Sequence, residues 1–207
     1  RIFEPVSRQA VEFFSERIAP YPYEKLANVQ AAGIGGGTEH ATAIFYGENT
    51  VRTTPQTSLV AHEIAHQWFG DAVTESDWDD AWLSEGFATY FTLLFIEHQY
   101  GRDEFLRGLA SSRERVLAFD KTQPDYRVVH DNLADMAKVT TGQTYQKGAW
   151  ILHMLRGMVG DEAFVRGMQR FYRDNGFRRA SFDDIRVAFE AVSERKLGGF
   201  FDQWVLR

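Results

Sequence analysis

Hydrophobic residues recur at helical spacing over most of this chain and form strand-like runs only near its beginning. Residues 5–19 place apolar side chains three and four positions apart, as one face of a helix does, and Pro20 ends the pattern. Two short apolar runs follow at 26–35 and 40–51, joined by glycines, and they predict two strands. Residues 71–80 are predicted to form a short strand or a turn.

Helical periodicity dominates the rest of the sequence. It is lost between residues 121 and 143, where Pro124, Gly142 and several aspartates predict a long surface loop. The remaining segments are predicted to be helices, at 57–70, 82–100, 102–120, 145–159, 161–174, 182–195 and 198–206. A small β portion followed by a mainly helical body is an α+β arrangement, and 207 residues suffice for about one domain.

Several helix boundaries coincide with residues that commonly begin or end helices. Thr57 or Ser58 can cap the start of the 57–70 helix, and Gly70 can end it. Asp161 and Ser181 are candidate N-caps, because their side-chain oxygens can accept hydrogen bonds from backbone N–H groups at a helix start.

The helix predicted at 57–70 contains the pattern His-Glu-x-x-His. His62 and His66 are four residues apart, so their imidazoles lie on one helix face, and Glu63 stands beside them. Two imidazoles presented to one point are typical of a zinc site. The alternative interpretation is a helix with two surface histidines, and a third ligand is needed to decide.

Glu85 supplies that third ligand. It follows His66 after a gap of 18 residues and lies in the next predicted helix. A His, His, Glu set leaves one position of a tetrahedral zinc open, which is the catalytic arrangement. Such a zinc lowers the pKa of a bound water to about 7, and Glu63 is placed to take a proton from that water. We therefore expect one Zn²⁺ per chain, bound by His62, His66 and Glu85.

Composition and charge narrow the possible partners. The net charge is −6, and basic residues are interspersed with acidic ones, which argues against a nucleic-acid surface. No cysteine is present, so disulfides and thiolate ligands are excluded. No apolar run approaches ~18 residues, so we expect a soluble chain without a membrane span. The chain starts at Arg1 without a signal sequence, and both ends are expected to be cuts through a longer protein, so its compartment is not predicted.

Four segments, taken together, resemble the gluzincin metallopeptidases and, within them, the M1 aminopeptidases. They are GGGTEHATAIFY (35–46), HEIAHQWFGD (62–71), WLSEGFATYF (82–91) and TYQKGAWILHML (144–155). The resemblance implies a single thermolysin-like catalytic domain over residues 1–207. Its expected parts are a helix with the β portion at 1–56, the zinc-site helices at 57–100 and a helical part at 101–207.

The resemblance also implies roles for two further residues. In the family, a tyrosine in a Tyr-x-Lys-Gly segment stabilises the oxyanion, and Tyr145 in TYQKG matches it. A glutamate in a Gly-x-Met-Glu-Asn segment binds the free N-terminus of the peptide, and Glu39 in GGTEH matches it. Thr38 and His40 depart from the commonest form of that segment, which leaves the preferred first residue open.

The activity implied is zinc-dependent removal of N-terminal residues from peptides. One alternative is a relative that also opens a lipid epoxide. Another is a non-catalytic scaffold, although such relatives usually lose zinc ligands or the base, and here all four residues are present. The resemblance further implies an N-terminal β domain, outside this chain, that packs against it.

The other histidines are expected to lie outside the metal site. His40 is not needed as a fourth ligand, because three are already supplied. His98, near a helix end, is predicted to face solvent. His153 is predicted to be a core residue or to support the site from behind it, and His130, in the long loop, has no assigned role.

Overall fold

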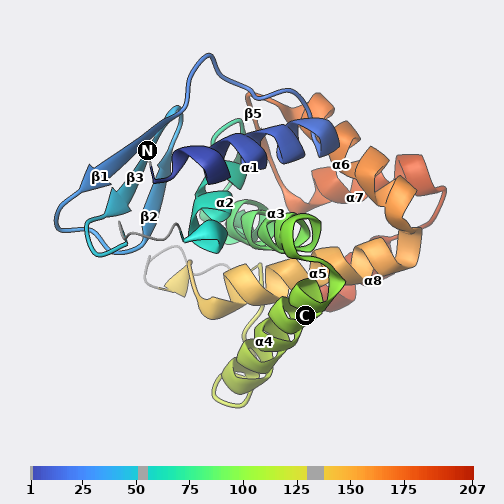
Figure 1. The fold of residues 1–207 in the computed structure, drawn as a ribbon. Helices are drawn as coiled ribbons and strands as arrows, with labels where there is room; N and C mark the ends of the chain where they lie inside the picture. Colours follow the sequence, from blue (N-terminus) through green and yellow to red (C-terminus); the bar gives the residue numbers. More distant parts are fainter. Residues whose placement is uncertain (1, 51–55, 130–137) are drawn as a thin grey trace.

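The computed structural model describes residues 2–50, 56–129 and 138–207, and it places a small sheet beside a helical body (Figure 1). Helix α1 (Glu4–Arg17) leads into strands β1 (Ala27–Ala31), β2 (Gly37–His40) and β3 (Ala43–Gly47). The later helices are α2 (Thr57–Ala65), α3 (Trp82–Tyr100), α4 (Arg102–Asp120), α5 (Gly142–Val159), α6 (Asp161–Asn175), α7 (Phe182–Ser193) and α8 (Gly198–Trp204). The predicted α+β fold is confirmed, and no described helix is long and apolar enough to cross a membrane.

The sheet has three strands where the hydrophobic pattern predicts two. β3 lies in the centre, parallel to β1 and antiparallel to β2. The additional strand, β2, forms mainly from the link between the two predicted strands, and the chain turns back between His40 and Ala43, with Thr42 at a positive φ of 70°. Glu39 therefore lies within edge strand β2, opposite Ile44 of β3, and not in a loop that precedes a strand.

Two helices that carry residues of the predicted site, α2 and α5, differ from their predicted bounds. α2 ends at Ala65 and not at Gly70, and its N-cap is Gln56, so neither Thr57 nor Ser58 caps it. α5 begins at Gly142, three residues before the prediction, because Thr141 forms a capping box. The Thr141 Oγ1 accepts from the Gln143 N–H at 3.2 Å, and the Thr144 Oγ1 accepts from the Thr141 N–H at 3.1 Å. By contrast, the bounds predicted for α3 and α4 are confirmed.

The C-terminal part contains one strand in addition to the predicted helices. β5 (Arg178–Ala180) pairs in parallel with β4 (Val73–Glu75), which follows the α2 segment. Ser181 caps α7 as predicted, and its N–H donates to the Asp184 carboxylate at 2.8 Å. Asp161 is not an N-cap, because Gly160 occupies that position and Asp161 is the first helical residue.

The core is centred on α3, which packs against α2, α4 and α5 (Figure 1). Large aromatic side chains of α3 and of the turn after α2 are fully buried, among them Trp82, Phe87 and Phe95 of α3 and Trp68 of the turn. The hydrophobic effect of burying such rings holds α2 and α3 side by side. The polar residues that these two helices present to each other are consequently fixed on a rigid support.

Candidate metal and active site

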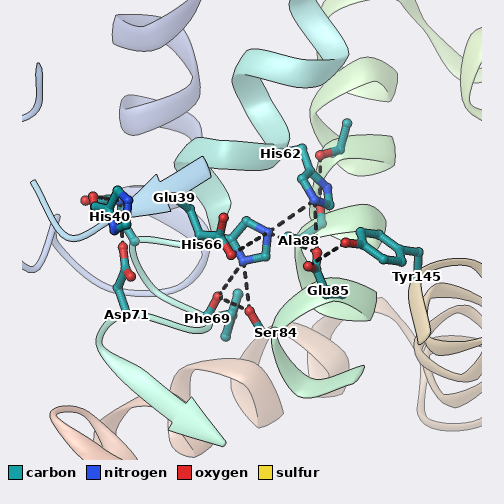
Figure 2. Close-up of polar contacts among 12 residues, drawn as sticks. Glu39, His40, His62, His66, Phe69, Asp71, Ser84, Glu85, Ala88 and Tyr145 are labelled. Atoms are coloured by element: carbon teal, nitrogen blue, oxygen red, sulfur yellow. Dashed lines mark hydrogen bonds and ion pairs between the residues drawn. The ribbon is translucent and has the colours of Figure 1, made fainter. Parts of the chain in front are cut away.

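The three predicted zinc ligands come together between α2 and α3 (Figure 2). The Nε2 atoms of His62 and His66 are 3.1 Å apart, and each lies 3.2 Å from the Oε2 atom of Glu85. His62 lies in the last turn of α2, His66 is the C-cap of that helix, and Glu85 comes from the first turn of α3. The packing of α2 against α3 therefore closes the 18-residue gap in the sequence.

The triangle of donor atoms fits a zinc ion. Tetrahedral zinc with ligands at about 2.0–2.1 Å separates neighbouring ligand atoms by about 3.3–3.4 Å. The three separations here, 3.1 to 3.2 Å, are close to that spacing. Two imidazole nitrogens and one carboxylate oxygen also form the donor set expected of catalytic zinc, with one position left for water or substrate.

Hydrogen bonds orient the His66 ring from behind. Its Nδ1 lies 3.0 Å from the carbonyl oxygen of Phe69 and 2.9 Å from the Ser84 hydroxyl. A carbonyl only accepts, so Nδ1 carries the proton and Nε2 offers its lone pair to a metal. The carbonyl of Phe69 can point back at His66 only because the α-helix has already ended at Ala65.

Electrostatics favour a positive charge at this point. Burial lowers the pKa of His66, but the carboxylates around it, of which Glu85 is the nearest, raise it to about 10. Burial would raise the pKa of Glu85, but its hydrogen bonds with the two histidines outweigh burial and hold that pKa well below its usual range. A divalent cation would supply the same positive charge in place of a proton.

Glu63 lies on the side of α2 that faces strand β2. It is buried, and burial raises the pKa of its carboxyl to about 8. Gly37 makes this position possible, since a Cβ atom there would lie 2.5 Å from the Glu63 Cδ. No other residue type fits at position 37 without moving Glu63. The Glu63 carboxylate therefore lies between β2 and α2.

Tyr145, at the start of α5, reaches the same cluster from the other side (Figure 2). Its hydroxyl donates to the Oε1 of Glu85 at 2.6 Å, and its ring stacks on that of His62 with centroids 5.9 Å apart. Burial and the neighbouring Glu85 raise the pKa of this phenol, so it keeps its proton and acts as a donor.

Glu39 lies on the side of the cluster opposite Tyr145 (Figure 2). Its Oε1 is 4.0 Å from the Nε2 of His66, and its side chain is 30% exposed. No lysine or arginine within the described part of the chain forms an ion pair with it. A partly exposed carboxylate beside the metal ligands, without a basic partner, can accept a ligand ammonium.

Two supporting residues, Ser84 and Gln67, were not predicted. The buried Gln67 side chain connects the segment just after α2 to the turn that follows Glu39. It accepts from the Thr42 N–H at 2.9 Å and donates to the His40 carbonyl at 3.2 Å. The sequence feature that could have identified them is their position. Gln67 follows His66 and Ser84 precedes Glu85, and each is a polar residue in an apolar run.

The other histidines lie away from the cluster wherever they are described. His40 is exposed and packs edge-on against Phe45, and His98 is exposed, as predicted. His153 is half-buried, and its Nδ1 lies 3.2 Å from the hydroxyl of the buried Tyr90. His130 lies outside the described residues.

Comparison with known proteins agrees with this geometry. The model of the peptidase family M1 domain matches residues 6–204. Tricorn protease-interacting factor F2 of Thermoplasma acidophilum is 28% identical over 97% of this chain and 27% of its own length. Glutamyl aminopeptidase of Rattus norvegicus is 30% identical over 96% of this chain and 23% of its own length. The crystal structure of the M1 zinc metallopeptidase from Deinococcus radiodurans superimposes with a TM-score of 0.81 at 28% identity, over 98% of this chain and 43% of that one.

The chain thus spans about a quarter of the length of these curated relatives. The family match nevertheless covers almost all of its residues, and the predicted zinc ligands converge within the matched part. The chain belongs to peptidase family M1, a family of zinc metallopeptidases.

Proposed function

We propose that this chain is the catalytic domain of a zinc-dependent aminopeptidase, which removes N-terminal residues from peptides. The observation that carries the proposal is Glu39, whose carboxylate lies 4.0 Å from a nitrogen of the histidine cluster. An exopeptidase must favour a free α-amine over an internal peptide bond, and a charge-assisted hydrogen bond to a carboxylate does so. In the Deinococcus radiodurans metallopeptidase, a mutant was solved bound to a Tyr-Ser-Ala substrate, which supports a peptide substrate here.

His62, His66 and Glu85 would hold the zinc. Zinc bound there supplies Lewis acidity, which brings the pKa of a coordinated water to about 7. Glu63 accepts the proton of the attacking water and passes it to the leaving amine, because its carboxylate is buried beside the ligands and free of any lysine or arginine partner among the described residues. Tyr145 would turn its single O–H from Glu85, to which it donates in this structure, to the oxygen on which charge develops.

The parent protein would contribute more of the cleft. Because the relatives are about four times as long as this chain, we propose that further domains, including an N-terminal β domain, pack against it. Their absence would weaken substrate orientation, which can be worth several kcal/mol of a barrier. The isolated 207-residue chain should therefore bind zinc but hydrolyse peptides slowly.

The test compares one substrate, alanine 4-nitroanilide, with its N-acetylated form. The zinc-loaded protein should strongly prefer the free amine. Glu39→Ala should reduce kcat/KM for the free amine by roughly 2–4 kcal/mol, or about 30- to 1,000-fold, and narrow the preference. Glu48→Ala is the matched control, since Glu48 is an exposed glutamate just past the same sheet. An unchanged preference in Glu39→Ala would place the amine site elsewhere.

A second comparison distinguishes an enzyme from a scaffold. Glu63→Gln should retain zinc and lose nearly all turnover, since an amide cannot accept the proton. Zinc-loaded protein that hydrolyses no amino-acid amide or peptide, even when joined to its flanking domains, would favour the scaffold.

A further inference from the structure

A cleft runs from the metal cluster toward α4. His62 and Tyr145 form part of its wall at the cluster end, and Ser111 and Arg115 of α4 form part of its wall farther out. Its volume is about 500 Å³, within the range of sites that hold small ligands. Because His62 and Tyr145 belong to both, the cleft adjoins the site.

The direction of the substrate follows from the two sides of the cluster. Glu39 lies on one side and Tyr145 on the other (Figure 2). If Glu39 holds the α-amine, the first residue occupies the Glu39 side and the scissile carbonyl faces the ligand cluster. The residues after the scissile bond then extend past Tyr145, into the cleft.

The charge of this cleft is unusual for the protein. The chain has a net charge of −6, yet no aspartate or glutamate lines the described part of the cleft. Arg115 is its one lining residue with a permanent charge among those described, since His62 is neutral when it binds a metal. The wall thus presents an isolated positive charge to whatever enters.

Arg115 also differs from Arg102 and Arg107 of its helix. Arg102 pairs with Glu97, and Arg107 pairs with Glu104. Arg115 is exposed and forms no ion pair with any described residue. Its five N–H donors are consequently available to a ligand, and a guanidinium matches a carboxylate in a two-point geometry.

We propose that Arg115 binds a carboxylate in the part of the substrate that follows the scissile bond. The inference rests on the proposed function for the direction of the substrate. Two sources share this chemistry: the C-terminal carboxylate of a short peptide and the side chain of an acidic residue. Either one would make short or acidic peptides better substrates than neutral, C-terminally blocked ones.

The experiment uses three matched peptides, Ala-Gln-amide, Ala-Glu-amide and Ala-Gln. The first carries no carboxylate, the second carries one on a side chain, and the third carries one at the C-terminus. Dissociation constants are measured by calorimetry on zinc-loaded Glu63→Gln, in which the peptides stay intact. One of the two carboxylate peptides should bind about five- to thirty-fold more tightly than Ala-Gln-amide, between the effects of exposed and desolvated ion pairs.

Variants at two positions of α4 identify the group responsible. Arg115→Gln should abolish the preference, and Arg115→Lys should keep part of it. Arg113→Gln is the matched control, because Arg113 is an exposed arginine on the same helix that does not line the cleft. A preference that survives Arg115→Gln, or that Arg113→Gln abolishes equally, overturns the proposal.

The two hypotheses fail in different ways. Equal binding of all three peptides, or binding of none, overturns the role of Arg115. A carboxylate preference that depends on Arg115, in a protein that hydrolyses none of these peptides before Glu63 is replaced, supports the carboxylate site and counts against the aminopeptidase.

Discussion

Helices α3 and α5 touch through two glycines directly beside the site, and this contact can be tested by adding one methyl group. A Cβ atom at Gly86 would lie 2.8 Å from the Cα of Gly148, 3.0 Å from its carbonyl carbon and 3.2 Å from the Thr144 carbonyl oxygen. These are backbone atoms of α5, so no side-chain rotation can relieve the contact. Gly86→Ala must therefore move the two helices apart.

The structure sets the size of the effect. Restoring ordinary contact distances of about 3.4–4 Å requires a displacement of about 0.6 Å or more. Overpacking of this kind costs about 1–3 kcal/mol, and the gain in helix propensity offsets about 1 kcal/mol. The net loss of stability is up to about 2 kcal/mol, or up to about 8 °C in Tm for a chain of this length.

The substitution should lower kcat as well as stability, because residues close to these two glycines belong to the proposed active site. Glu85 precedes Gly86, and Tyr145 precedes Gly148 by one helical turn, with 2.6 Å between the phenol oxygen and the carboxylate. A displacement of about 0.6 Å would lengthen that hydrogen bond beyond 3 Å, and misplacement near 1 Å can cost as much as 10²-fold in rate. We expect at least a tenfold fall in kcat.

The assay combines urea unfolding with kcat on alanine 4-nitroanilide. Gly148→Ala should reproduce the loss, since its Cβ would lie 2.9 Å from the Cα of Gly86. Gly157→Ala, in the same helix, has nothing within 4 Å of its Cβ and should gain about 0.5–1 kcal/mol without loss of kcat. A Gly86→Ala protein as stable and as active as the original would refute this reasoning.

Three further predictions follow from the site and its surroundings. His66→Ala should lose zinc and activity together, since two protein ligands hold the metal far less tightly than three; elemental analysis that finds full zinc in the variant would contradict the ligand assignment. Tyr145→Phe should retain zinc and lower kcat by roughly 10²–10³; a raised KM with unchanged kcat would instead make the tyrosine a substrate-positioning group. Burial raises the pKa of Asp80 to about 6. The folded state therefore binds this proton more tightly than the unfolded state does, and the carboxyl group destabilises the folded protein as the pH rises from about 4 to 6. Asp80→Asn keeps an oxygen for the Phe182 N–H and should gain about 1–2 kcal/mol over the original protein between pH 4.5 and 7.5, measured by urea unfolding with a chelator; an advantage that does not change with pH would contradict the assigned pKa.

The sequence by itself predicted the residues of the candidate metal cluster, which the structure brings together. His62 and His66 are four residues apart on one face of the α2 segment, and their relation depends only on local backbone hydrogen bonds, which periodicity reports directly. The bounds of α3 and α4 were predicted for the same reason, since their apolar patterns are long and uninterrupted. The roles of Tyr145 and Glu39 came from resemblance to a family and stay predictions.

Tertiary packing decided what surrounds the cluster. The end of α2 at Ala65 allows the Phe69 carbonyl to turn back to His66, and Gln67 holds the turn between β2 and β3. Both features depend on hydrogen bonds that helix and strand propensities do not describe. The cleft leading to Arg115 likewise exists only because α2, α3, α4 and α5 pack around it. The local sequence pattern thus determines which side chains lie on the same face of a helix. Packing in the tertiary structure determines which other groups those side chains contact.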